Sequence, residues 1–180
     1  MNKRILIIVF VLVTAYVFYS LSAKKTDSIS PNYEADQSVV ESSPSAHSVD
    51  KKASFVIFTH GTFRIFTDPK YHNQSEDVFI EAQNPNIVKV KKDGITWNVF
   101  FKTLPFSLTH ECLVTGTKQT FCSGANGVLK FYRNGELVQD LLNQKIQQND
   151  QVLVSFGNEN EFEIQKQLER VVQVAKEYEK

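Results

Sequence analysis

The sequence has no excess of charge of either sign. Its 180 residues include 20 lysines and arginines and 20 aspartates and glutamates, which cancel. A protein that binds nucleic acid usually carries a basic patch or stripe, so we expect no nucleic-acid partner. Methionine occurs once, whereas phenylalanine occurs 14 times. A core filled by aromatic and β-branched residues favours a sheet over a helical bundle.

Motifs of well-known chemistry are also missing. The sequence contains no Gly-x-Ser-x-Gly, no His-Glu-x-x-His, no phosphate-binding loop and no dinucleotide fingerprint. The histidines at positions 60, 72 and 110 are scattered and form no recognisable base–nucleophile pair. We therefore predict no catalytic residues, no cofactor and no metal site, and a binding or structural module rather than an enzyme.

Cysteine occurs only twice, as Cys112 and Cys122, and the two do not form a Cys-x-x-Cys motif. Their even spacing, with Gly116 between them and β-prone residues on both flanks, places them opposite each other if the segment is a hairpin. Opposed residues in a hairpin lie close to disulfide distance. We predict a structural disulfide. Thiol–disulfide exchange, or a metal clip that also uses His110, remains open.

A long apolar run opens the chain. Residues Ile5 to Ala23 carry no charge, and about 20 apolar residues suffice to cross a bilayer. The run is longer than the apolar core of a cleaved signal peptide, so we predict a membrane anchor over residues 1–25, with a signal peptide as the alternative. Lys3 and Arg4 favour a cytoplasmic N-terminus. The expected location is the cell membrane, with a single span and the C-terminal domain outside.

The next segment, residues 26–52, is rich in serine, proline and acidic residues and shows no sustained period. Such a composition cannot bury enough apolar surface to order itself. We therefore expect a disordered stalk over 26–52, a globular domain over 53–157 and a C-terminal amphipathic helix over 158–180.

The first part of the globular domain predicts a hairpin, a strand and a helix. "ASFVIFTHGTFRIF" is two β-rich runs joined at His60-Gly61, and the first run is apolar on both faces, which indicates a central strand. Ile87 to Val90 fits a further strand. Thr96 fits the N-cap of a helix whose apolar residues face one side, and Pro105 follows the end of that helix.

The second part predicts two further strands and a final helix. A strand over Val128–Arg133 ends at Asn134-Gly135, a strong hairpin signal, and another covers Gln151–Phe156. The final helix has an apolar stripe, which we expect to pack on the sheet: Ile164, Leu168, Val171, Ala175 and Tyr178. We predict an α+β fold, a small mixed sheet with one packed helix in a β-grasp-like arrangement, flanked by the N-terminal transmembrane helix and the C-terminal helix.

Two segments are candidates for contact with a partner. The loop "TDPKYHNQSED" contains Tyr71 and His72, which we select as possible partner-binding residues. It also contains Asn73-Gln74-Ser75, a pattern for N-glycosylation at Asn73. The hairpin between the two cysteines is the other candidate.

The globular domain resembles an uncharacterised membrane-anchored family of archaea and candidate-phylum bacteria, whose members are sometimes labelled "protein-disulfide isomerase". The resemblance covers about residues 53–168 and is carried by Gly94–Thr96, Phe100-Phe101, Cys112, Cys122, Leu129–Gly135 and Asp150–Gly157. Members of the family often have a His-x-His pair where this chain has Lys89 and Lys91. A lysine ammonium has no lone pair for a metal, so the resemblance implies no metal site in this chain.

These observations favour a membrane-tethered extracytoplasmic module that binds a protein or a surface polymer and has no catalytic activity. The membrane contact would be made by residues 5–23. One alternative is a thiol–disulfide exchange factor that uses Cys112 and Cys122. Another is an accessory subunit of an envelope complex, engaged through the C-terminal helix.

Overall fold

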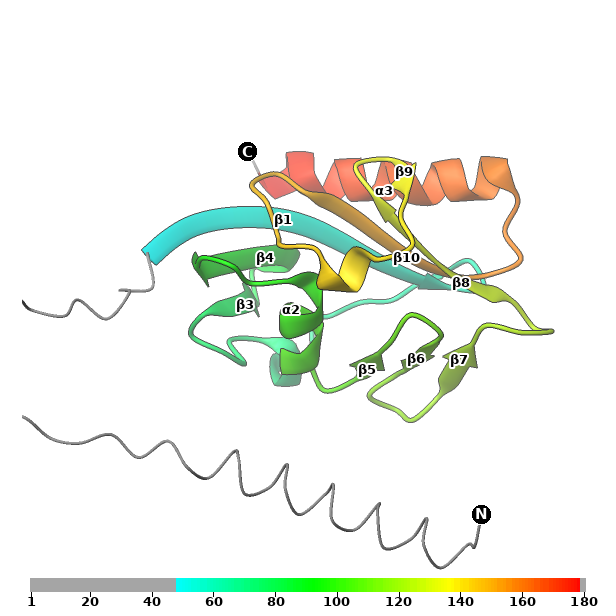
Figure 1. The fold of residues 1–180 in the computed structure, drawn as a ribbon, viewed down its shortest axis with the longest axis horizontal. Coiled ribbons are helices and arrows are strands. Elements are labelled where there is room, and N and C mark those ends of the chain that lie inside the picture. The colour runs from blue at the N-terminus through cyan, green and yellow to red at the C-terminus, as the bar shows by residue number, and fades with distance from the viewer. Residues whose placement is uncertain (1–47, 179–180) are drawn as a thin grey trace, which may run out of the picture. The chain divides into compact units, whose positions relative to one another are not determined.

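The computed structural model describes residues 48–178 (Figure 1). The predicted anchor over 1–25 and the first part of the predicted stalk, residues 26–47, lie outside the described residues. Within the described range, no helix is long and apolar enough to cross a membrane.

The described chain is an α+β fold built on a mixed sheet, as predicted. The strands are β1 (Ser48–Thr59), β2 (Thr62–Phe63), β3 (Val78–Glu81), β4 (Asn84–Lys92), β5 (Ser107–Leu108), β6 (Cys112–Val114), β7 (Thr120–Cys122), β8 (Val128–Arg133), β9 (Glu136–Leu137) and β10 (Gln151–Gly157). The helices are α2 (Trp97–Thr103) and α3 (Glu161–Tyr178), with short 3-10 turns η1 (Pro69–Tyr71) and η2 (Leu141–Asn143). The larger sheet has the order β3-β4-β1-β10-β8-β9, with β2 paired to β1, and β5-β6-β7 form a smaller sheet.

The strand β1 is central, which confirms the inference from its two apolar faces. It pairs in parallel with β10 and antiparallel with β4. Its turn into β2 uses His60 (φ 48°) and Gly61 (φ 69°), the two left-handed residues that a type I′ hairpin turn requires. The strand begins at Ser48, earlier than the expected domain start at Ala53. The polar residues 48–52 are held by pairing with β4 and by an ion pair from Lys51 to Asp93. The hydrophobic pattern of the sequence reveals neither interaction.

Helix α2 covers one face of the sheet. The Thr96 hydroxyl caps it by accepting from the Val99 N–H at 3.3 Å, as the sequence predicts. Trp97, Phe100 and Phe101 are fully buried in the larger core, which they share with the inner faces of β1, β3, β4 and β10.

Helix α3 packs on the opposite face, against β1, β4 and β10 (Figure 1). The expectation that this helix packs on the sheet is therefore confirmed. Of the predicted stripe, Ile164 and Val171 are buried, Leu168 and Tyr178 are half-buried and pack against the same cluster, and Ala175 is half-buried. Gln167 and Val174, which were not predicted, are also buried in it. Because Gln167 is polar, the apolar pattern of the sequence selects Leu168 and not Gln167 for the buried face.

Candidate functional site

The small sheet carries the predicted disulfide. Cys112 and Cys122 face each other directly in the antiparallel pair β6–β7 and are bonded. The Cys122 residue is exposed, and Cys112 is half-buried. The nearby His110 has its Nε2 3.2 Å from an Asp140 carboxylate oxygen. No group of three or more His, Cys, Asp or Glu side chains placed to hold a metal occurs among residues 48–178.

The loop with the predicted partner residues folds back on the core. Asp68 caps the turn η1 by accepting from the Lys70 N–H at 3.0 Å. The Tyr71 ring packs edge-on against Phe66, with 5.2 Å between ring centroids. The His72 side chain is held by a hydrogen bond, because its Nε2 lies 2.8 Å from the Phe66 carbonyl oxygen. Both residues are half-buried, and of the two it is Tyr71 that lines a pocket at the junction with the disulfide hairpin.

Asn73, the predicted glycosylation residue, is exposed and has a left-handed backbone (φ 52°). Its side chain lies on the surface, where a glycan could be attached. The glycosylation itself stays a prediction.

The loop and the disulfide hairpin, selected separately from the sequence, meet in the fold. A Cβ placed on Gly116, at the tip of the hairpin, would lie 3.2 Å from the Tyr71 hydroxyl and 3.1 Å from the Pro105 carbonyl oxygen. The hairpin backbone therefore packs tightly against the loop. A side chain at position 116 would push the two segments apart.

A pocket of about 200 Å³ lies at this junction, and we call it the loop–hairpin pocket. Its floor is aromatic, with Phe66, Tyr71 and Phe106, and Ile65 stands at its edge. Phe63 also lines it, but the Phe63 ring packs against Phe58 on the α3 side of the sheet. The Ile65 side chain is 65% exposed, one of the most exposed large apolar residues in the described chain. An aromatic floor with an exposed aliphatic edge is typical of a contact surface.

Arg64 gives this pocket a positive rim. Its Nε donates to the Thr59 hydroxyl at 2.6 Å, and its guanidinium lies 5.2 Å from the centroid of the Phe121 ring on β7. The arginine is thus held between the β1–β2 hairpin and the disulfide hairpin, and both regions position it. Sequence reasoning missed Arg64 and Ile65, because Ile65 continues the apolar pattern after β2 and its exposure is evident only in the structure.

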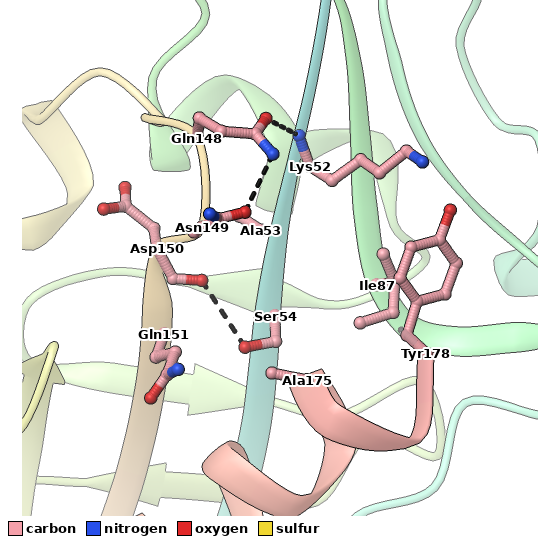
Figure 2. A pocket seen from close by; sticks show the side chains of 10 residues that line it. All are labelled: Lys52, Ala53, Ser54, Ile87, Gln148, Asn149, Asp150, Gln151, Ala175 and Tyr178. Carbon is pink, nitrogen blue, oxygen red and sulfur yellow. Dashed lines mark hydrogen bonds between the residues drawn. The ribbon is translucent and has the colours of Figure 1, made fainter. Parts of the chain in front are cut away.

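A larger pocket, about 650 Å³, lies at the opposite end of β1 (Figure 2). Its polar groups are already engaged with one another: the Gln148 Oε1 accepts from the Lys52 N–H at 2.8 Å, and the Gln148 Nε2 donates to Asn149 at 2.8 Å. The Lys52 ammonium lies 4.9 Å from the centroid of the Tyr178 ring, and Tyr178 raises the pKa of Lys52. We interpret this end as structural.

No protein-family model, curated protein or solved structure matches the chain.

Proposed function

We propose that this protein is a membrane-tethered extracytoplasmic module that holds a polypeptide partner through the loop–hairpin pocket, without a catalytic step of its own. The observation that carries this proposal is the convergence of Tyr71, Ile65 and the disulfide hairpin on one aromatic pocket. The anchor over residues 1–25 and the cytoplasmic N-terminus are part of the proposal and rest on the sequence.

The size of the pocket favours a single side chain as its occupant. Sites for small molecules usually measure about 300–1,000 Å³, and this pocket, at about 200 Å³, is smaller. The aromatic floor suits an apolar side chain, and the guanidinium of Arg64 at the rim suits a carboxylate next to it. We therefore expect a partner segment with an apolar anchor residue beside an acidic one. A surface polymer without apolar groups would leave the floor of the pocket unused.

The direction of β1 fits the tether. In Figure 1 this strand runs from the end of the sheet next to the C-terminal end of α3 to the end next to the disulfide hairpin. Twelve residues of strand span roughly 40 Å at about 3.3 Å each. If the chain is anchored before Ser48, the loop–hairpin pocket lies at the far end of the domain, where it can reach a partner.

The finer description of the fold as β-grasp-like is also a proposal. It is supported by the order β4-β1-β10-β8, in which β1 and β10 are central and parallel. Helix α2, which follows β4, also fits this arrangement.

The test is a selection of peptides from a random library on the full-length protein in nanodiscs. We expect an enriched consensus with an apolar residue beside Asp or Glu, and loss of binding by Ile65→Lys. Val99→Lys is the matched control, because Val99 is also exposed (43%) but lies on α2, outside the pocket. The absence of a consensus, or equal binding by both variants, would contradict the proposal.

Thiol–disulfide exchange is the second candidate, because the exposure of Cys122 leaves its sulfur within reach of another thiol. Glutathione titration of the Cys112–Cys122 pair separates the two functions. A reduction potential below about −300 mV marks a structural disulfide, whereas a value between about −120 and −230 mV, with fast exchange, supports the redox function.

A further inference from the structure

A third pocket, of about 500 Å³, lies on the other side of the β1–β2 hairpin, and we call it the acceptor pocket. It is formed where the His60-Gly61 turn meets the connection between β10 and α3, and Phe58, Glu159 and Gln167 line it. Successive side chains of a strand point to opposite faces. Ile57 therefore faces the loop–hairpin pocket, and Phe58 faces the acceptor pocket.

The Glu159 carboxylate is only half satisfied. Its Oε1 accepts from the Gly61 N–H at 3.0 Å, whereas its Oε2 is buried without a hydrogen-bond partner among residues 48–178. The carboxylate lies over Gly157, where a Cβ would overlap it. The glycine therefore leaves room for the carboxylate, which any other residue at position 157 would displace. A buried carboxylate oxygen without a donor is unfavourable.

Gln167 presents a second unsatisfied acceptor. It is 5% exposed, and its Oε1 has no hydrogen-bond partner in the described part of the chain. It lies in the buried stripe of α3, at a position where an apolar residue would be ordinary. Glu159 and Gln167 line one pocket, and each has a buried oxygen without a donor. We take these two unsatisfied acceptors as the sign of a ligand with several donors.

The neighbouring cations do not fill this role. The Lys130 ammonium donates to the backbone oxygen of Glu159, at 3.3 Å, and not to its carboxylate. The Lys166 ammonium lies 4.4 Å from the centroid of the Phe162 ring. Within residues 48–178, neither Glu159 nor Glu163 has a basic group within 4.0 Å. Lys166 also lines the pocket, and the Glu163 Oε2 accepts from the Asn160 N–H at 2.9 Å. The Glu159 carboxylate is the group left without an ion pair among the described residues.

We propose that the acceptor pocket binds a guanidinium group, such as that of an arginine side chain on a polypeptide. A guanidinium carries a permanent positive charge and five N–H donors in a planar fork, and has no acceptor. It can donate to Glu159 and Gln167 together, and its plane can stack on an aromatic ring such as Phe58. The acceptor pocket and the loop–hairpin pocket have no residue in common, so this proposal stands or fails separately from the proposed function.

The test is an NMR titration of the full-length protein in detergent micelles. The probe is N-acetyl-arginine amide, and the neutral isostere N-acetyl-citrulline amide is the control ligand. We expect saturable shifts of the Gly61 amide and of the Gln167 side-chain amide with the arginine probe, and none with citrulline, up to about 10 mM. N-acetyl-lysine amide distinguishes a guanidinium site from a general cation site: equal or tighter binding of lysine would overturn the proposal.

Two variants locate the binding. Glu159→Gln and Gln167→Met keep the side-chain volumes, and each should weaken the arginine probe roughly tenfold by removing one acceptor. Glu169→Gln, an exposed carboxylate on the same helix, should leave the affinity unchanged. A native amide spectrum shows that each variant is folded. Unchanged affinity in Glu159→Gln, or no saturable shift in the unmodified protein, would overturn the proposal.

Discussion

The two ends of β1 differ in how completely their polar groups are satisfied. At the end near Lys52, ion pairs and hydrogen bonds connect neighbouring side chains, as in Lys51 with Asp93 and Gln148 with the Lys52 N–H. At the end near Gly61, the carboxylate of Glu159 and the amide of Gln167 have unpaired oxygens, and Ile65 is exposed. We infer that unsatisfied groups on residues that line a pocket mark the surface that binds a partner. Two further unsatisfied groups among the described residues, Trp97 Nε1 and Ser155 Oγ, are fully buried and line neither proposed binding pocket.

The largest expected effect is at a satisfied site, Asp150. This residue is 2% exposed and forms an ion pair with Arg133 (2.8 Å), while its other bonds include one from the Gln147 N–H (2.9 Å). Asp150→Ala leaves the arginine without its partner and should lower the free energy of unfolding by about 3–5 kcal/mol. Urea unfolding measures this loss.

The control for this prediction is Asp140→Ala. The Asp140 side chain is 62% exposed, and its contact with His110 is on the surface. We expect a loss of about 1 kcal/mol or less. If the two variants were equally stable, the satisfied groups would not be stabilising the fold.

The corresponding change at the other end is Glu159→Gln. The substituted side chain can still accept from the Gly61 N–H. The substitution removes a negative charge that forms no ion pair among the described residues. We expect the free energy of unfolding to change by about 1 kcal/mol or less, or to rise. A loss of the size expected for Asp150→Ala would show that Glu159 is structural and would remove the contrast between the two ends.

The smallest effect concerns acid stability. Lys51 lowers the pKa of the exposed Asp93 carboxyl from its ordinary value, by a hydrogen bond and by its charge. A lowered folded-state pKa contributes stability that is present above the unfolded pKa and is lost as pH falls through the folded pKa. Between about pH 5 and pH 2, Lys51→Met should therefore lose less stability than the unmodified protein. Lys102→Met, on the exposed side of α2, should keep the original pH profile.

The sequence was sufficient for features determined by local pattern. The apolar faces of β1, the His60-Gly61 turn, the Thr96 cap and the opposed cysteines follow from period, turn chemistry and even spacing. The pairing of residues 48–52 with β4 was not predictable in this way, because a partner strand distant in sequence holds that polar segment.

The candidate site was predicted only in part. Tyr71 and the disulfide hairpin were selected as separate surfaces, and their meeting at Gly116 depends on tertiary packing. Gln167 and Glu159 gave no signal, since a glutamine or glutamate near a helix start is ordinarily solvated. Their importance comes from burial without a partner, which only three-dimensional structure reveals.

The most direct test that a partner binds the loop–hairpin pocket is hydrogen-exchange footprinting of the full-length protein with a peptide from the selection experiment. If the peptide binds the loop–hairpin pocket, exchange becomes slower in residues 61–67 and in the disulfide hairpin, residues 112–122. Exchange around Lys52 and Tyr178 then stays unchanged. Protection confined to the Lys52 end would contradict this expectation, because the partner would then bind where the polar groups are already satisfied.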